Sequence, residues 1–305
     1  MKSKVVLAYS GGLDTSFCIP YLTREKQLEV HTLLVNTGGF SPKEVSELSQ
    51  KALDLGAASH KTIDVREEYY SRCIRYLIFG NVLKNNTYPL SVSSERAFQA
   101  MKVADYARRS GAHAIAHGST GAGNDQVRFD YFIHVMAPEI NLIAPIRDLN
   151  ISRKEEVEYL RNQGFDFHWE KSRYSINQGL WGTSIGGVQT LSSMGELPEE
   201  AYPIKCTKKG TEVLTIGFSG GEPVSLNGTG MDPIRVIEKI REIAAPYGIG
   251  RDIHVGDTII GLKGRVGFEA AAPMILIKAH HLLEKHVLGK WQLYWKDQLA
   301  IWYGM

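Results

Sequence analysis

The residues best suited to chemistry lie near the amino terminus, in the run Ala8-Tyr-Ser-Gly-Gly-Leu-Asp-Thr-Ser16. This run follows an apolar segment with a strand pattern and enters a segment with a helix pattern. The two glycines allow backbone N–H groups to approach an anion, the hydroxyls add donors, and the helix directs its positive end there. A carboxylate such as Asp14 supplies the oxygen ligands that Mg²⁺ prefers. The run therefore predicts a phosphate site, with Asp14 as a possible magnesium ligand.

The loop differs from the GxxxxGK[ST] motif, in which a lysine reaches the β- and γ-phosphates. The alternative explanation is a Gly-Gly turn capped by serines, with no ligand. The order of the residues between a strand and a helix favours the phosphate site.

A second polar run, from His117 to Phe129, also starts at the end of a predicted strand. Glycines at 118, 121 and 123 indicate that the backbone approaches a ligand closely. Asn124, Asp125 and Arg128 place a polar cluster at a helix start, where an arginine could clamp a carboxylate. A capped helix with a surface arginine would explain this run alone. Its place on the same sheet edge as the first run favours a ligand site.

The elements that must position both runs form an α/β pattern. Five apolar runs alternate with amphipathic segments, which predicts an open parallel sheet flanked by helices. They are residues 4–9, 30–35, 60–64, 112–117 and 141–144. Ligands of such sheets bind beyond the carboxyl ends of the strands, at the loops that start at Ser10, Asn36, His117 and Pro145.

The pattern changes after about Phe167, where turn residues and shorter strand candidates predict an α+β domain. We expect strands at 212–218 and 258–262, and helices from Asp232 to Ala245 and from Pro273 to His286. The predicted domains are therefore a nucleotide-binding domain at 1–167 and a substrate-binding and oligomerisation domain at 168–305.

The bulk composition of the 305 residues, with 43% hydrophobic and 22% charged, is that of an ordinary globular protein. A net charge of +2 gives no global attraction for nucleic acid. Cys18, Cys73 and Cys206 lack the spacing of zinc or redox motifs, and no run approaches the ~18 apolar residues of a membrane span. We expect a cytoplasmic protein without a signal peptide, a membrane segment or a nucleic-acid partner.

Five segments, in this order, resemble those of argininosuccinate synthases, which belong to the PP-loop ATP pyrophosphatases. They are the two runs above, Ile143 to Arg147, Tyr174 to Ile185, and Lys278 to His281. The resemblance implies a PP-loop nucleotide-binding fold followed by an α+β synthetase domain. It also implies a ligase of arginine biosynthesis that joins citrulline to aspartate through a citrullyl-adenylate, with ATP cleaved to AMP and pyrophosphate. Mg²⁺ and a homo-oligomer, most simply a tetramer, are implied as well.

The resemblance assigns roles to individual residues. The ATP-binding positions are Ala8, Tyr9, Ser10, Gly11, Gly12, Leu13, Asp14, Thr15, Ser16, Val35 and Gly118. The aspartate-binding positions are Thr120, Asn124 and Asp125, and the citrulline-binding positions are Tyr88, Ser93, Asn124, Arg128, Ser175 and Ser184. Without a ligand, Tyr88 would be a turn aromatic, and Ser175 and Ser184 would be helix caps. No catalytic base is assigned, because this chemistry depends mainly on positioning and charge stabilisation.

The sequence departs from the family mainly on the citrulline side. Gly256 and Phe268 stand where the family has a glutamate and a tyrosine, and Asn177 and Gly186 replace acidic residues. Ala122 replaces a lysine of the second run. The chain ends at Met305, where the family continues, so we expect the usual tail to be absent, through truncation or a different assembly.

These departures leave two other functions open beside citrulline–aspartate ligation. One is a synthetase for an N-acylated citrulline, and the other is an ATP-binding protein that has lost synthesis. An RNA-modifying PP-loop enzyme is disfavoured, because paired cysteines and a basic, aromatic stripe are both missing.

Overall fold

The computed structural model describes residues 2–121, 124–165, 174–259, 261 and 263–305. They belong to two compact units, neither of which is continuous in sequence. Unit 1 comprises Met1–Val65, Glu95–Ser172 and Thr258–Leu262, and unit 2 comprises Arg66–Ser94, Arg173–Asp257 and Lys263–Met305. The predicted division at 167/168 and the departure at Ala122 lie outside the described residues. The division remains a prediction.

Unit 1 is built on a parallel sheet of five strands, which confirms the predicted α/β class. The strands are β1 (Lys4–Ala8), β2 (Glu29–Asn36), β3 (Ser59–Asp64), β4 (Ala114–His117) and β5 (Asn141–Ile143), in the order β3-β2-β1-β4-β5. In the centre, Leu7 is in register with Thr32 on one side and Ala116 on the other. The strand order reverses at β1, so a topological switch point lies between β1 and β4, where ligands of such sheets bind.

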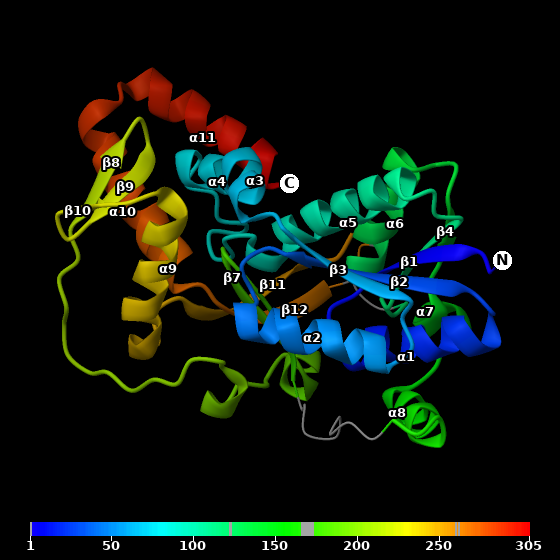
Figure 1. Cartoon of the computed structure of the whole chain (residues 1–305). Helices are drawn as coiled ribbons and strands as arrows, with labels where there is room; N and C mark the ends of the chain where they lie inside the picture. Colours follow the sequence, from blue (N-terminus) through cyan, green and yellow to red (C-terminus); the bar gives the residue numbers. More distant parts are fainter. Residues whose placement is uncertain (1, 122–123, 166–173, 260, 262) are drawn as a thin grey trace. The chain divides into compact units, whose positions relative to one another are not determined.

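Helices cover both faces of this sheet (Figure 1). They are α1 (Leu13–Pro20), which continues as a π-helix at Tyr21–Glu25, α2 (Pro42–Asp54), α5 (Ser91–Arg109), α6 (Asp125–Met136), α7 (Pro145–Leu149) and α8 (Arg153–Asn162). Successive strand residues point to opposite faces. Val5 and Leu7 therefore pack with Phe17 and Ile19 of α1, whereas Val6 packs with Ala104 and Ile133 of α5 and α6.

Unit 2 has two antiparallel sheets, as expected for an α+β region. The first has the order β11 (Arg251–Asp257), β12 (Lys263–Glu269), β7 (Gly182–Gly186) and β6 (Ser175–Gly179). The second has the order β10 (Thr229–Gly230), β9 (Glu222–Leu226) and β8 (Ile216–Ser219). The helices are α3 (Arg66–Tyr69), a π-helix at Tyr70–Ile74, α4 (Arg75–Phe79), α9 (Pro233–Ala244), α10 (Ala271–Val287) and α11 (Lys290–Gly304). Short 3-10 turns lie at Val188–Leu191, Glu199–Ala201 and Ala245–Tyr247.

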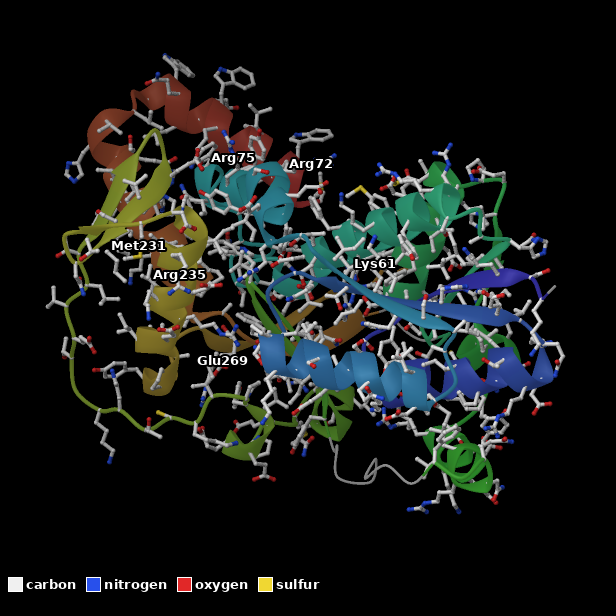
Figure 2. All side chains as sticks on the ribbon, viewed as in Figure 1. Lys61, Arg72, Arg75, Met231, Arg235 and Glu269 are labelled. Atoms are coloured by element: carbon white, nitrogen blue, oxygen red, sulfur yellow. The ribbon has the colours of Figure 1, made fainter. Side chains whose placement is uncertain are left out.

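The segment 66–94 is fastened to unit 2 by polar contacts. The Tyr70 hydroxyl donates to Glu222 of β9 at 2.9 Å, and Arg75, labelled in Figure 2, lies 3.8 Å from the same carboxylate. The indole N–H of Trp181, which is fully buried, donates to the carbonyl of Pro89 at 2.9 Å. These contacts explain why a segment that follows β3 in the chain belongs to the other unit.

The predictions for the second half were partly right. The two helices are confirmed as α9 and α10, and α9 begins where the Asp232 side chain accepts the backbone N–H of Arg235 at 3.1 Å. The strand predicted at 212–218 is confirmed only from Ile216 onward. The strand predicted at 258–262 is wrong, because the described residues there form the turn that joins β11 to β12. Gly261, with φ +84°, sits in that turn. Among the described helices, none is long and apolar enough to cross a membrane.

Candidate active site

The first polar run forms a tight loop between β1 and α1. Gly11 has φ +76°, a conformation that side chains other than glycine rarely adopt, and a Cβ there would overlap the Leu48 side chain of α2. Gly12 is the exposed N-cap of α1 in extended conformation. The chain therefore needs glycine at 11 for packing, whereas position 12 faces open space on the side of the helix terminus.

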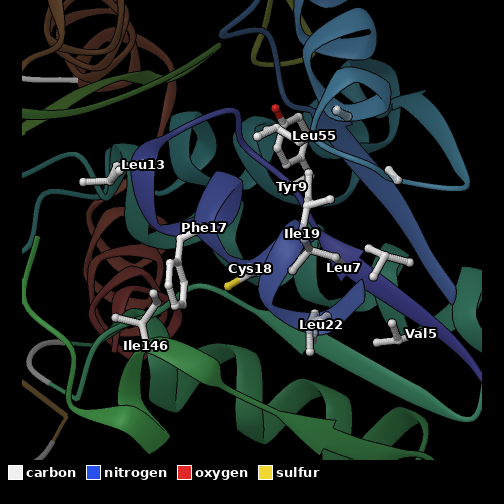
Figure 3. Close-up of a cluster of buried hydrophobic side chains, with 14 of the residues drawn as sticks. Val5, Leu7, Tyr9, Leu13, Phe17, Cys18, Ile19, Leu22, Leu55 and Ile146 are labelled. Atoms are coloured by element: carbon white, nitrogen blue, oxygen red, sulfur yellow. The ribbon is translucent and has the colours of Figure 1, made fainter. Parts of the chain in front are cut away.

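Hydrogen bonds within the loop hold its hydroxyl groups near the α1 terminus. The Thr15 hydroxyl is 3.3 Å from that of Ser10 and also 3.3 Å from the carbonyl of Gly12. The helix behind them is anchored in the core by Leu13, Phe17 and Ile19 (Figure 3). The Thr15 and Ser16 hydroxyls donate to carbonyls of the loop and so fix its shape. The backbone N–H groups at the start of this rigid helix therefore suit a phosphate group. Lys51 of α2 donates to the carbonyl of Gly11 at 2.8 Å, a contact that sequence analysis missed.

Asp14 is paired with a carboxyl group that the sequence did not point to. Glu156 of α8 has 1% of its surface exposed and lies close enough to Asp14 for the two carboxyl groups to influence each other's ionisation. Burial, and then the charge of Asp14, raise the pKa of Glu156 to about 8, and burial raises the pKa of Asp14 as well. Glu156 Oε2 has no hydrogen-bond partner among the described residues. Two adjacent carboxyl groups with a spare oxygen fit a divalent cation.

The second polar run packs directly on the first. A Cβ on Gly118 would lie 3.0 Å from Thr15 Cγ2 and 3.1 Å from its backbone nitrogen, so the absence of a side chain lets the loops meet. His117 Nδ1 accepts the backbone N–H of Ser119 at 3.2 Å, which leaves Nε2 to donate to Asp130 at 2.9 Å. Arg147 also binds Asp130, at 2.6 Å. The histidine thus has a structural role at the end of β4.

A group of alternating charges follows at the start of α6. Asp125 lies 3.1 Å from Arg96 Nε and 3.2 Å from Arg128 Nη1. Burial opposes ionisation, but the two guanidinium groups hold the pKa of Asp125 below its usual value. Asn124 Oδ1 accepts the backbone N–H of Ile259 at 2.7 Å. These contacts make Asp125 an ionised acceptor whose side chain is still 41% exposed.

Behind this group lies a buried carboxyl group that sequence analysis also missed. Glu95 has 1% of its surface exposed and accepts a hydrogen bond from the Thr37 hydroxyl at 2.8 Å. Its other oxygen lies 3.9 Å from Arg96. Burial raises the pKa of Glu95 to about 7, although the nearby Arg96 charge counteracts part of the rise.

The positions assigned to citrulline divide between the units. Of these, Asn124 and Arg128 belong to unit 1, whereas Tyr88, Ser93, Ser175 and Ser184 belong to unit 2. Unit 1 also holds the exposed Thr120, assigned to aspartate, and the buried Val35, assigned to ATP. Ser184 of β7 is in register with Phe268 of β12 and with Asn177 of β6.

Ser175 and Ser184 are strand residues, so the helix-cap explanation is wrong for both. The buried Ser93 hydroxyl has no hydrogen-bond partner among the described residues.

Tyr88 lies in an aromatic cluster of unit 2. Its ring stacks on His254 with centroids 5.0 Å apart and contacts Phe268 at 5.3 Å. The Ser91 hydroxyl donates to the Tyr88 hydroxyl at 3.3 Å. Burial, and then the Lys84 charge, lower the pKa of His254, so the ring is neutral at neutral pH. A Cβ at Gly256 would lie 2.6 Å from His254 Nε2, so this arrangement leaves little room for a side chain at 256.

A parallel sheet with a glycine loop and a helix terminus at its switch point defines an α/β protein that binds a nucleotide. A family profile described as "Arginosuccinate synthase N-terminal HUP domain" matches residues 4–166, and one described as "Arginosuccinate synthase C-terminal domain" matches residues 174–305. The chain belongs to the argininosuccinate synthase family. It is an ATP-dependent ligase that forms a carbon–nitrogen bond.

Relatives from several archaea agree with this assignment. The chain is 40% identical to the argininosuccinate synthase of Methanocaldococcus jannaschii, covering 100% of this chain and 77% of that protein. It is 41% identical to the argininosuccinate synthase of Methanothermobacter thermautotrophicus, covering 99% and 75%, and 40% identical to that of Pyrococcus furiosus, covering 96% and 72%. The chain thus spans about three quarters of the length of these relatives.

Proposed function

We propose that this chain condenses citrulline with aspartate and acts in arginine biosynthesis. The ureido oxygen of citrulline attacks the α-phosphorus of ATP, the bond to the bridging oxygen breaks, and pyrophosphate leaves. The aspartate amine then attacks the ureido carbon of the citrullyl-adenylate, and AMP leaves with the ureido oxygen. The observation that carries this proposal is the loop of residues 10–16 with Gly118 packed on it, because it gathers anion donors at one helix terminus.

In this proposal the first loop holds the triphosphate of ATP. Its donors stabilise the negative charge that collects on the leaving pyrophosphate. Asp14 and Glu156 are the residues that would hold Mg²⁺, which neutralises phosphate charge when bound. Their raised pKa values support this role, because a bound cation would offset the cost of ionising both buried carboxyl groups.

Aspartate would bind at the second loop. Asp125, kept ionised by Arg96 and Arg128, is suited to accept a hydrogen bond from the α-ammonium group of the substrate. The two arginines beside it are suited to a substrate carboxylate. Asn124 and Thr120 complete the set that we propose for this substrate.

A second candidate substrate is an N-acylated citrulline, and the aromatic cluster of unit 2 favours it. A buried α-ammonium group needs an acceptor or an anion beside it. Gly256 and Phe268 offer neither, and the neighbouring His254 is neutral, so it offers an acceptor nitrogen but no negative charge. An acyl group on that nitrogen would remove the charge and present an apolar surface to the cluster.

One assay separates these functions. Pyrophosphate release is measured with ATP, Mg²⁺ and aspartate, together with citrulline, N-acetylcitrulline or N-succinylcitrulline. Turnover with citrulline supports the main proposal, and a preference for the free amine above roughly a hundredfold in kcat/KM, about 2.7 kcal/mol, eliminates the acylated substrates. Binding of ATP without pyrophosphate release in every mixture would instead identify a protein that has lost synthesis.

We also propose that the protein is a cytoplasmic homo-oligomer, most simply a tetramer. The face of α11 formed by Trp291, Trp295, Leu299 and Trp302 is between 62% and 73% exposed in the single chain. These four positions follow helical spacing and form an apolar stripe, which a second copy would cover. Sedimentation at micromolar concentration tests this, and a monomer contradicts it.

A further inference from the structure

Lys51 of α2 contacts the backbone of the proposed phosphate loop at Gly11. It lies in the last turn of α2, and its ammonium group donates to the carbonyl oxygen of Gly11 at 2.8 Å. Leu48, three residues earlier on α2, occupies the space beside the Gly11 α-carbon. Two side chains from one face of α2 therefore hold the backbone of Gly11 in place. The Ser16 hydroxyl lies 3.5 Å from the same carbonyl, on the α1 side.

This contact also determines where the next N–H group points. In a trans peptide the carbonyl and the following N–H are directed to opposite sides, and the chain has no cis peptide among the described residues. With the Gly11 carbonyl held by Lys51, the N–H of Gly12 is directed away from α2. Gly12 is the exposed N-cap of α1, so this donor faces the open side of the loop.

The charge of Lys51 adds to this geometry. A hydrogen bond from an ammonium group to a carbonyl polarises the peptide and strengthens its N–H as a donor. The Lys51 side chain is partly buried, which weakens the screening of this effect by water. Burial lowers the pKa of Lys51 to about 8, so the group is still largely protonated at neutral pH.

We propose that Lys51 is a positioning residue for pyrophosphate: it orients and polarises the Gly11–Gly12 peptide so that the Gly12 N–H binds a phosphate oxygen. The inference rests on the proposed function, because it assigns Lys51 to the ATP loop. Lys51 acts through the peptide and does not itself touch the substrate.

The test compares Lys51→Met with two other variants of the full chain. Lys51→Arg keeps a cationic donor at this position. Lys43→Met removes a lysine from the same helix whose side chain is 86% exposed and lies 3.8 Å from Glu47. The measurements are kcat, the KM values for ATP and aspartate, the inhibition constant for pyrophosphate, and pyrophosphate binding by calorimetry.

Loss of a charge-assisted hydrogen bond should weaken ATP and pyrophosphate binding in Lys51→Met about 10- to 100-fold. The KM for aspartate should stay within about twofold, because the second loop is unchanged. Lys51→Arg should restore most of the loss, and Lys43→Met should match the wild type. If Lys51→Met does not fold, Lys51→Gln, which shortens the side chain and removes the charge, should show the same selective loss.

Two results overturn the inference. One is a folded Lys51→Met or Lys51→Gln variant that binds pyrophosphate as tightly as Lys43→Met. The other is a uniform loss for ATP, aspartate and thermal stability that Lys51→Arg does not repair, since that identifies a packing role. A wild type that releases no pyrophosphate from ATP would instead contradict the proposed function, and the calorimetric comparison would still decide the role of Lys51.

Discussion

Replacing Gly11 or Gly12 by alanine should separate the packing of the phosphate loop from its binding of phosphate. At Gly11 the φ of +76° costs a residue with a side chain about 1–2 kcal/mol. The overlap is with a terminal methyl of the partly buried Leu48 side chain, whose displacement adds up to roughly 1 kcal/mol. At Gly12 the φ of −67° is an ordinary one, and the nearest neighbour of a new Cβ would be Ser10 Oγ at 3.5 Å. Only Gly11→Ala should therefore destabilise the fold.

Thermal unfolding and ATP kinetics measure the two effects. A loss of about 1–3 kcal/mol should lower the Tm of Gly11→Ala by roughly 3–10 °C, whereas Gly12→Ala should unfold like the wild type. Gly12→Ala, and more strongly Gly12→Val, should raise the KM for ATP, because the side chain enters the space of the phosphates.

A double variant checks the cause of the loss at Gly11. Adding Leu48→Ala to Gly11→Ala removes the overlap but keeps the strained φ, so part of the loss should be recovered beyond additivity. A Gly11→Ala variant with the wild-type Tm, or a Gly12→Ala variant that unfolds while its ATP kinetics are unchanged, would contradict these roles of the two glycines.

Three further substitutions test the rest of the site. Asp14→Asn should abolish most ATP-dependent turnover and leave the Tm unchanged or higher, because it removes a partly buried charge; full activity in a magnesium titration would remove Asp14 from the site. Arg128→Ala should cost about 1–3 kcal/mol in kcat/KM, and unchanged kinetics for both amino acids would show that the second loop is only a capped turn. Glu95 has a raised pKa in the folded chain, so it favours folding below the unfolded value of about 4.5, and this contribution is lost as the pH rises through about 7. Glu95→Gln should therefore flatten the fall in unfolding free energy, on the order of 1–3 kcal/mol, between about pH 4.5 and 7, and an unchanged denaturation profile would contradict the assignment.

Local pattern was sufficient to predict the sheet of unit 1 and the glycine loop that follows its first strand. Short apolar runs with helical segments between them admit few arrangements other than a parallel sheet, and the loops then share one edge. The position of Gly11 between a strand and a helix likewise predicted an anion site before any contact was known. The strand prediction failed at 258–262, because the pairing of Asp257 with Lys263 leaves the described residues between them in a turn.

Tertiary structure alone decided which side chains from distant parts of the chain join the site. Lys51 is 40 residues from Gly11, and Thr37 is 58 residues from Glu95, so helical or strand periodicity does not encode either contact. Glu156 meets Asp14 only because α8 packs on α1 around Leu160 and Phe17. The segment 66–94 follows a strand of unit 1 but belongs to unit 2, through contacts such as Trp181 with Pro89. Local sequence determines where a helix or loop starts, whereas the burial of its apolar face determines which polar groups are brought together and how their pKa values shift.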